Sequence, residues 1–417
     1  MIETIKTILR PVVHPLRLFK RSRQVDIYNK SIPKRVEEIS THQPIRVMFY
    51  VANVAMWKSD KLLDLLKEDN RFEPIIVSYL YDFDTFENKQ TTETEVSSYF
   101  ISKDVEYHCG FDFTKNSLIP ANTFNADVLF YPQPYTDSFR QLPTRGLLSY
   151  IPYCFGMEDD MRFYNRLYHN VCWKMFAPTS LHKEIEKKYN RNKGSNVCVV
   201  GNPLSDYFYD GHEASSKDWK IQDSSLKRII WAPHHSILPE DTLDYSNFLE
   251  IADKMLELAE KYSEKVQFVF KPHPRLRDKL NKLPEWGKER TDRYFNEWAS
   301  RCNTNFANGN YVDLFLTSDA LIHDCSSFTA EYLYTNKPVM FVTDREEIPG
   351  FNEFAKKCFA VHYKGSSMEE IEQFIKDVID GSDVMRPKRS AFVNQYFKPQ
   401  DGKTVAEKIY EELSALK

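Results

Sequence analysis

Residues 318–344 read SDALIHDCSSFTAEYLYTNKPVMFVTD and join two apolar, strand-like runs through a loop and a helical segment. Asp324, Ser326 and Ser327 occupy the loop, and Thr329 opens the helical segment. The first backbone N–H groups of a helix are unpaired and lie at the positive end of its dipole. Two small hydroxyls at this position add donors with little bulk, so the stretch predicts a phosphate-binding helix start.

Strand-like and helical runs alternate on both sides of the chain's middle. Apolar, β-rich runs occupy residues 44–53 and 73–80 in the first half and begin residues 227–237 and 266–276 in the second half. Strands that alternate with helices indicate parallel α/β sheets. Residues 210–225 are polar and poor in large apolar side chains, which is typical of a linker.

The length of 417 residues favours two domains over one core. We therefore expect an α/β protein with two Rossmann-like parallel-sheet domains that face a central cleft. The predicted divisions, in chain order, are a basic amphipathic segment (1–40), a first domain (41–209), a linker (210–225), a second domain (226–390) and a C-terminal helix (391–417).

Charge and cysteine content exclude several classes of protein. The net charge of −4 gives no reason to expect nucleic-acid binding. The seven cysteines are scattered and form no CxxC pair, which is typical of reduced thiols rather than of disulfides or a zinc site. No secretory signal and no apolar run of about 18 residues is present, so we expect a cytoplasmic protein.

The N-terminal segment adds a second expectation about location. Residues 1–25 combine apolar side chains at helical spacing with a series of basic ones: Lys6, Arg10, Arg17, Lys20, Arg21 and Arg23. A basic amphipathic segment can lie on an anionic membrane surface, here the inner face of the cell membrane. The alternative is a helix that docks on its own domain.

Three loops of the second half follow strands and carry groups suited to a diphosphate. Because ligands of open α/β sheets bind beyond the carboxyl ends of the strands, we expect these loops to converge. Their polar residues are His234 and His235 in the first loop, Lys271, His273 and Arg275 in the second, and Asp324, Ser326 and Ser327 in the third. Glu331, one helical turn beyond, is expected to accept hydrogen bonds from ribose hydroxyls. Neither GxxxxGK[ST] nor GxGxxG occurs.

The stretch FKPHP, followed some 50 residues later by DALIHDCSSFTAEYLYTNKPVMFV, resembles the CDP-glycerol glycerophosphotransferases, which are teichoic-acid and capsule polymerases and primases. The resemblance covers roughly residues 225–390, with looser similarity from about residue 44. It implies a GT-B fold whose first domain takes the acceptor and whose second domain holds the CDP moiety. It further implies that His273, Ser326 and Ser327 contact the diphosphate, and it places Glu331 where the family has an acid.

Two departures from the family pattern leave the general base open. The family often has a His-Gly pair in its first domain, whereas YIPYCFGMEDD (150–160) keeps Gly156 without a histidine. The family's Ala-Pro-Thr loop is replaced by a sequence that contains His234 and His235. The candidate bases are therefore these two imidazoles, or Glu158 or Asp159 on the facing domain if burial raises the carboxyl pKa.

The resemblance implies a transferase that moves a polyol phosphate, glycerol phosphate foremost, from a CDP-activated donor to a hydroxyl of a cell-surface polymer or its lipid-linked primer. We expect no required cofactor, no nucleic-acid partner and no assigned metal site, and the need for a divalent cation stays open. Asp82 and Asp84 are interpreted as part of a polar loop. Two alternatives remain: a GT-B glycosyltransferase or UDP-N-acetylglucosamine 2-epimerase-like enzyme of capsule or lipopolysaccharide synthesis, and a non-catalytic nucleotide-binding scaffold.

Overall fold

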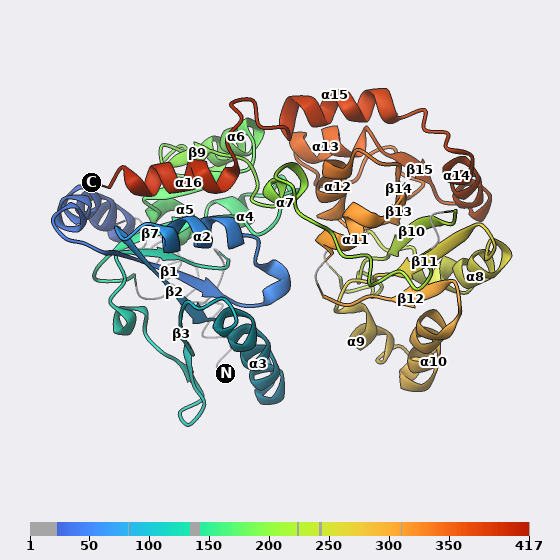
Figure 1. The fold of residues 1–417 in the computed structure, drawn as a ribbon, viewed down its shortest axis with the longest axis horizontal. Helices are drawn as coiled ribbons and strands as arrows, with labels where there is room; N and C mark the ends of the chain where they lie inside the picture. Colours follow the sequence, from blue (N-terminus) through green and yellow to red (C-terminus); the bar gives the residue numbers. More distant parts are fainter. Residues whose placement is uncertain are drawn as a thin grey trace, which may run out of the picture. The chain divides into compact units, whose positions relative to one another are not determined.

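The computed structural model describes residues 23–81, 83–133, 142–222, 225–241, 244–309 and 311–416. Most of the basic N-terminal segment (1–22) and Asp82 lie outside the described residues. The chain forms two compact units (Figure 1). The first unit comprises the described residues up to Tyr153, Asp160–Pro203 and the stretch from Lys403, and the second comprises Cys154–Asp159 and Leu204–Gly402. Among the described residues, no helix combines the length and apolar character needed to span a membrane.

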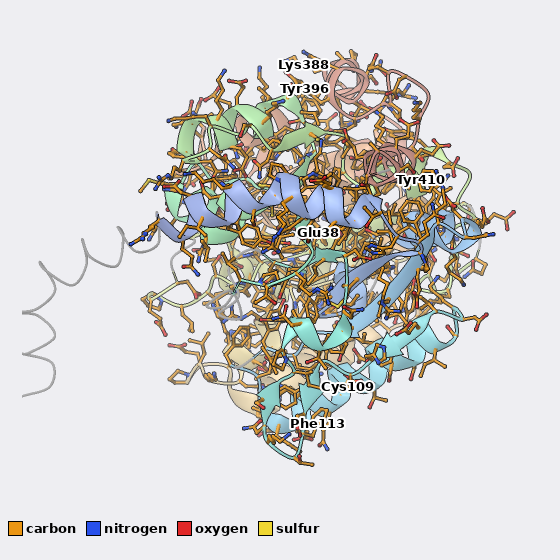
Figure 2. The ribbon with its side chains drawn as sticks, turned by 90° about the vertical axis from the view of Figure 1, so that its left-hand side faces the viewer. Glu38, Cys109, Phe113, Lys388, Tyr396 and Tyr410 are labelled. Carbon is orange, nitrogen blue, oxygen red and sulfur yellow. The ribbon has the colours of Figure 1, made fainter. Side chains whose placement is uncertain are left out.

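The first unit is built on a seven-stranded parallel sheet in the order β3-β2-β1-β6-β7-β8-β9. The strands are β1 (Ile45–Val51), β2 (Phe72–Ser78), β3 (Glu106–His108), β6 (Val128–Phe130), β7 (Leu147–Tyr150), β8 (Lys174–Ala177) and β9 (Val197–Val199). A separate hairpin joins β4 (Phe111–Asp112) to β5 (Ser117–Leu118), with Phe113 near its tip (Figure 2).

Helices of the first unit include one over residues 23–40. The others are α2 (Asp60–Glu68), α3 (Phe86–Ile101), α4 (Met161–Tyr164), α5 (Leu167–Val171), α6 (Ser180–Tyr189) and α16 (Val405–Ser414), with 3-10 turns at Val54–Met56 and Ala121–Phe124. The side chains of strand β1 show why both faces of this sheet are buried. Val47 and Phe49 enter one apolar cluster, while Met48 and Tyr50 enter another, as expected of a parallel strand buried on both sides.

The second unit contains a six-stranded parallel sheet in the order β12-β11-β10-β13-β14-β15. Its strands are β10 (Lys227–Ala232), β11 (Val266–Phe270), β12 (Thr304–Phe306), β13 (Ala320–His323), β14 (Val339–Val342) and β15 (Tyr363–Gly365). Its helices are α7 (Ser205–Tyr209), α8 (Phe248–Lys261), α9 (Leu276–Leu280), α10 (Gly287–Ser300), α11 (Val312–Thr317), α12 (Phe328–Glu331) with the 3-10 turn η4 (Tyr332–Thr335), α13 (Glu353–Phe359), α14 (Met368–Asp380) and α15 (Arg386–Tyr396). Apolar side chains of α8, α10 and α14 pack on this sheet in one cluster.

The expected α/β class with two parallel sheets is confirmed, but the chain divides differently from the sequence expectation. The region 391–417, taken as one C-terminal helix, holds the end of α15 and the whole of α16, and only the latter joins the first unit. Ile409 and Leu413 pack in the core of the first unit. The hydroxyl of Tyr410, labelled in Figure 2, donates to Asp69 and fixes α16 on that unit.

The predicted linker over 210–225 is anchored to the second unit. Trp219 is buried and donates its indole N–H to the Thr317 hydroxyl at 2.8 Å. The backbone of Ile221 exchanges two hydrogen bonds with the Gln267 side chain. One large aromatic residue in a polar stretch therefore gives this segment a packed position.

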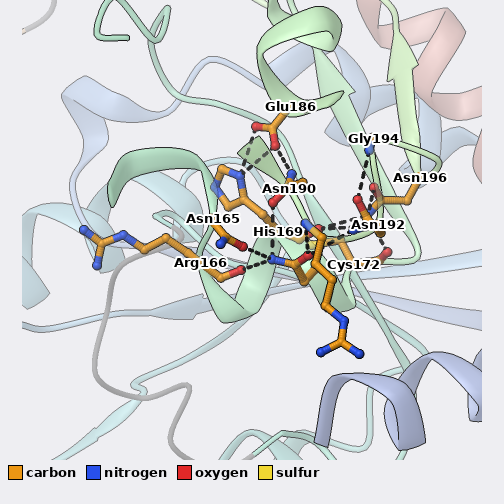
Figure 3. Close-up of polar contacts among 11 residues, drawn as sticks. Asn165, Arg166, His169, Cys172, Glu186, Asn190, Asn192, Gly194 and Asn196 are labelled. Carbon is orange, nitrogen blue, oxygen red and sulfur yellow. Dashed lines mark hydrogen bonds and ion pairs between the residues drawn. The ribbon is translucent and has the colours of Figure 1, made fainter. Parts of the chain in front are cut away.

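A buried polar network holds α5, α6 and the turn before β9 together in the first unit (Figure 3). His169 Nδ1 lies 3.0 Å from a carboxylate oxygen of Glu186, which also accepts the Asn190 amide. The side chain of Asn196 donates to the His169 carbonyl oxygen at 3.1 Å. The network satisfies polar groups that would otherwise be buried without partners.

Candidate functional site

The three polar loops of the second unit lie together, because β11, β10 and β13 are neighbours in the sheet. The backbone N–H of His273 donates to the Pro233 carbonyl oxygen at 3.0 Å, which joins the second loop to the first. The thiol of Cys325 donates to the Ala232 carbonyl oxygen at 3.2 Å, which joins the third loop to the first. The convergence expected from the sequence is therefore present at the carboxyl edge of this sheet.

Three imidazoles form the centre of this edge. The ring centroid of His235 lies 4.3 Å from that of His234 and 4.2 Å from that of His273. Burial, with the neighbouring imidazoles and cations, lowers the pKa of His234 to about 3, of His235 to about 4 and of His273 to about 2. All three rings are therefore neutral near pH 7.

Asp324 shapes the first loop from beneath. Its carboxylate is buried and accepts the backbone N–H groups of His234 and Asn247, the latter at 2.8 Å. Burial raises the pKa of Asp324 to about 7, while these hydrogen bonds favour the charged form. In the structure this carboxylate holds the loop of His234 against β13, and the expected role of Asp324 in nucleotide binding stays a prediction.

Lys271 places a buried positive charge at the same edge. Its side chain is 6% exposed, and its ammonium lies 6.0 Å from the ring centroid of Tyr311. Within the described part of the chain, this ammonium forms no hydrogen bond or ion pair. Burial lowers the pKa of Lys271 to about 8. A buried ammonium without an anionic partner is costly, so this position is suited to an anionic ligand. Arg275, at the start of α9, is exposed.

The serine pair stands before a shorter helix than the sequence suggested. The helical segment α12 spans only Phe328–Glu331 and passes directly into a 3-10 turn that ends at Asn336, in the left-handed conformation. So short a helix has a small dipole, and the helix start therefore contributes less to phosphate binding than the sequence predicts. Ser326 and Ser327 are partly exposed, and their hydroxyls form no hydrogen bond with the described residues. The serine hydroxyls, rather than the helix dipole, are therefore the groups suited to bind a phosphate here.

Glu331 is engaged within the unit. Its side chain is buried and accepts a hydrogen bond from the Tyr311 hydroxyl at 2.5 Å. Because the ring of Tyr311 lies near the ammonium of Lys271, Glu331 also helps to fix that side of the site. The expected contact of Glu331 with ribose hydroxyls stays a prediction.

Comparison with known proteins identifies the family. The profile described as CDP-glycerol:poly(glycerophosphate) glycerophosphotransferase matches residues 160–414. The chain belongs to this family.

Two relatives from Staphylococcus aureus (strain NCTC 8325 / PS 47) are teichoic acid ribitol-phosphate polymerases. TarK is 25% identical over 224 residues, which cover 52% of this chain and 40% of TarK. TarL is 25% identical over 218 residues, which cover 51% of this chain and 36% of TarL. The match therefore spans less than half of the length of either relative.

Solved structures show the same fold. The wall teichoic acid polymerase TagF has a TM-score of 0.60 and 13% identity, covering 96% of this chain and 98% of the TagF chain. The UDP-bound MnaA of S. aureus has a TM-score of 0.53 and 16% identity, covering 89% of this chain and 96% of MnaA. At these identities the likeness concerns the fold, which is GT-B-like.

The segment that differs from the glycerophosphotransferase pattern has an unexpected location. Residues 154–159 belong to the second unit, whereas the sequence predicts them in the first domain. Phe155, directly before Gly156, is buried and stacks at 5.1 Å on Phe354 and at 5.4 Å on Phe397. The residue before Gly156, where the resemblance leads us to expect a histidine, is therefore a buried phenylalanine.

The structure separates the two acidic candidates in this segment. Glu158 forms a β-bridge with Phe351 and is partly buried, whereas Asp159 is exposed. Burial, and to a smaller extent the charge of Glu158, raise the pKa of Tyr245, whose ring lies 5.4 Å from that of His234. Glu158 therefore belongs to the same unit as the imidazoles and lies near them. The role of Asp159 as a base stays a prediction.

Several residues of the site carried no sequence signal. Ser236, Tyr245 and Asn247 support the first loop, and Tyr311 links Lys271 to Glu331. Only Ser236 adjoins a predicted site residue in the chain, so the others could not be found without the fold. The first unit also contains a pocket of about 60 Å³ at the ends of β1, β6 and β7. The residues that line it include Asn53, Trp57, Lys58, Tyr131 and Tyr153.

Proposed function

We propose that this chain transfers a polyol phosphate from a CDP-activated donor to a hydroxyl of a cell-surface polymer or its primer. The observation that carries the proposal is the buried ammonium of Lys271 beside the imidazole cluster, together with the hydroxyls of Ser326 and Ser327. None of these groups has a hydrogen-bond or ion-pair partner among the described residues. Together these groups provide one positive charge and several hydrogen-bond donors, as a diphosphate requires. Family membership supports this reading.

In the proposed reaction the acceptor hydroxyl attacks the phosphorus distal to the nucleoside. The acceptor proton passes to a general base, the bond between the two phosphates breaks, and CMP leaves with the bonding electrons. Lys271 and the hydroxyls of Ser326 and Ser327 stabilise the charge that develops on the diphosphate. The pocket of the first unit, rich in aromatic residues, is a candidate for the acceptor.

Glycerol phosphate and ribitol phosphate are the two donors to compare. The family profile names glycerophosphotransfer, and one TagF structure followed a soak with CDPG. TarK and TarL are ribitol-phosphate polymerases. We favour CDP-glycerol because the profile matches a larger part of the chain than either relative does.

A non-catalytic nucleotide-binding scaffold is the second candidate. One observation favours it: the residue before Gly156 is Phe155, buried in an aromatic cluster, and not a histidine. A scaffold would bind CDP without releasing CMP from any activated donor.

The experiment is a nucleotide-release assay. The purified chain is incubated with CDP-glycerol, CDP-ribitol or UDP-N-acetylglucosamine and with a crude membrane acceptor, and CMP, CDP and UDP are separated by chromatography. CMP release that Lys271→Met abolishes is the expected result. Release of UDP, or a new sugar epimer, would instead indicate sugar-nucleotide chemistry. CDP binding without any release would favour the scaffold.

A further inference from the structure

The same hydrogen bond recurs at the ends of three adjacent strands. The Nδ1 atom of His234, in the loop after β10, accepts the backbone N–H of Ser236 at 3.2 Å. The Nδ1 atom of His273, after β11, accepts the backbone N–H of Arg275 at 3.2 Å. His323 of β13 accepts from the backbone of the residue two places on at 3.1 Å.

At His234 a second donor reinforces this contact. The hydroxyl of Ser236 lies 2.9 Å from the same Nδ1 atom. That hydroxyl oxygen itself accepts the backbone N–H groups of Tyr245 at 3.1 Å and Ser246 at 3.2 Å. With its lone pairs taken by two amides, the Ser236 hydroxyl directs its own proton to His234.

These contacts fix where the ring proton lies. A backbone amide can only donate, so an Nδ1 atom that accepts from it carries no proton. A neutral imidazole has one proton, which must then be on Nε2. In His234 and His273, Nε2 makes no hydrogen bond with any described residue, so each ring offers an N–H group to a ligand.

The same contacts argue against two other roles for the cluster. One ring nitrogen from each of His234, His235 and His273 lies within 4.8 Å of the others, a spacing that a metal ion could bridge. A ligating imidazole, however, needs a bare nitrogen for the metal and usually donates its other N–H. His234 and His273 have the reverse arrangement, because their bare nitrogen already accepts an amide. For the same reason Nε2 of neither ring can take a proton from an acceptor hydroxyl.

We propose that His234 joins His273 at the diphosphate of the CDP-activated donor, that both rings are neutral and give their Nε2–H groups to phosphate oxygens, and that neither binds metal or acts as the base. This inference rests on the proposed function and specifies the chemistry of its site. Lys271 supplies the positive charge, and the two imidazoles orient the phosphates through hydrogen bonds without adding charge. Proton removal then falls to His235, whose Nδ1 atom is buried without a hydrogen-bond partner among the described residues, or to Glu158.

Paired substitutions separate a donor from a base or a ligand. The amide nitrogen of glutamine can reach the place of Nε2, whereas that of asparagine lies nearer to Nδ1. For the full chain we therefore expect His273→Gln to keep CDP affinity within about threefold. His273→Asn is expected to weaken CDP binding about tenfold or more, the loss of one charge-assisted hydrogen bond. His234→Gln and His234→Asn form the second pair.

Calorimetric titration with CDP, with and without ZnCl₂, measures these affinities, and CMP release is followed in parallel. Glutamine variants that bind CDP but release no CMP would overturn the exclusion of a base. Stoichiometric zinc binding by the wild-type chain that every substitution abolishes would overturn the exclusion of a metal. Equal affinities for each glutamine and asparagine pair would overturn the donor role.

A second measurement needs no ligand and does not depend on turnover. In protein labelled with ¹⁵N-histidine, two-bond proton–nitrogen correlations report the tautomer, and each glutamine variant assigns its own ring. We expect His234 and His273 to remain neutral with the proton on Nε2 between about pH 8 and about pH 5.5. His323 provides an internal control, because it has the same contact but is fully buried. A proton on Nδ1 would overturn the inference, whereas absent CMP release with this tautomer intact would overturn only the proposed function.

Discussion

Asn352 is expected to hold the 154–159 segment in place, and its substitution tests that role. Its side-chain oxygen accepts the backbone N–H of Ala355 at 2.9 Å and caps α13. Its amide nitrogen donates to the carbonyl oxygens of Gly156 at 2.8 Å and Glu158 at 3.3 Å. The side chain is 1% exposed, so water cannot replace these partners without rearrangement.

Two substitutions divide this contribution. Asn352→Ser keeps a capping hydroxyl but cannot reach Gly156, and the loss of a buried hydrogen-bond partner costs about 1–3 kcal/mol. Asn352→Ala also loses the cap, which adds about 1 kcal/mol. We therefore expect the free energy of unfolding of the second unit to fall by about 1–3 kcal/mol for serine and about 2–4 kcal/mol for alanine.

Equilibrium urea unfolding followed by tryptophan fluorescence measures the loss, since four of the six tryptophans lie in the second unit: Trp219, Trp231, Trp286 and Trp298. Ser367→Ala is the matched control, because Ser367 caps the exposed start of α14 and contacts no part of the 154–159 segment. The control should lose only about 1 kcal/mol. If Asn352→Ser were as stable as the wild type, the hydrogen bonds to the segment would contribute nothing and the reasoning would fail.

Three further predictions concern separate parts of the molecule. Lys271→Met should weaken CDP binding at least about tenfold in calorimetry. Lys271→Arg should not restore the affinity, because the position is only 6% exposed and a guanidinium is larger than an ammonium. Undiminished affinity would contradict the role of Lys271 as the partner of the anion. His362 is buried and its pKa is lowered to about 3 from 6.5, so the unfolded chain binds the extra proton below pH 6.5. Stability is therefore fully present above pH 6.5 and falls on acidification by up to about 1.4 kcal/mol per pH unit, and urea unfolding of His362→Gln should show a shallower slope. Gly201→Ala should destabilise the first unit by about 2–4 kcal/mol in the same assay, because Gly201 has φ +106° and an added Cβ would lie 2.6 Å from Val405; an unchanged midpoint would refute this.

The sequence predicts the sheets and the loops at their edge because both follow from local patterns. Apolar runs define the strands, and polar residues directly after a run mark the carboxyl edge. The sequence therefore predicts that residues on three separate loops, such as His234, Lys271 and Ser326, lie at one edge of the sheet. The length of α12 could not be predicted, because the left-handed turn at Asn336 depends on its packing with α15, where Ser390 donates to its side chain.

Segments that cross between the units are not visible in local patterns. The 154–159 segment joins the second unit through Asn352, nearly 200 residues away in the chain. The stretch with α16 returns to the first unit through Ile409 and Leu413, whose spacing fits any helix with an apolar face. In both cases the sequence shows a segment able to pack but not its partner.

The identity of the general base depends on both the sequence and the packing of the second unit. The residue before Gly156 is Phe155, which stacks on Phe354 and Phe397 and cannot accept a proton. Fixed tautomers remove His234 and His273 from consideration. In His235, by contrast, no backbone amide of the described residues holds the Nδ1 atom. Burial lowers the pKa of His235 to about 4, so this ring binds a proton weakly until an anionic ligand is bound. Glu158 is tied to the same unit by its bridge to Phe351, close to Tyr245.

If His235 is the base, bound diphosphate should raise the apparent pKa of CMP release, and His235→Gln should abolish CMP release. If Glu158 is the base, Glu158→Gln should abolish release while CDP affinity is unchanged, and catalysis would then depend on Asn352 as well.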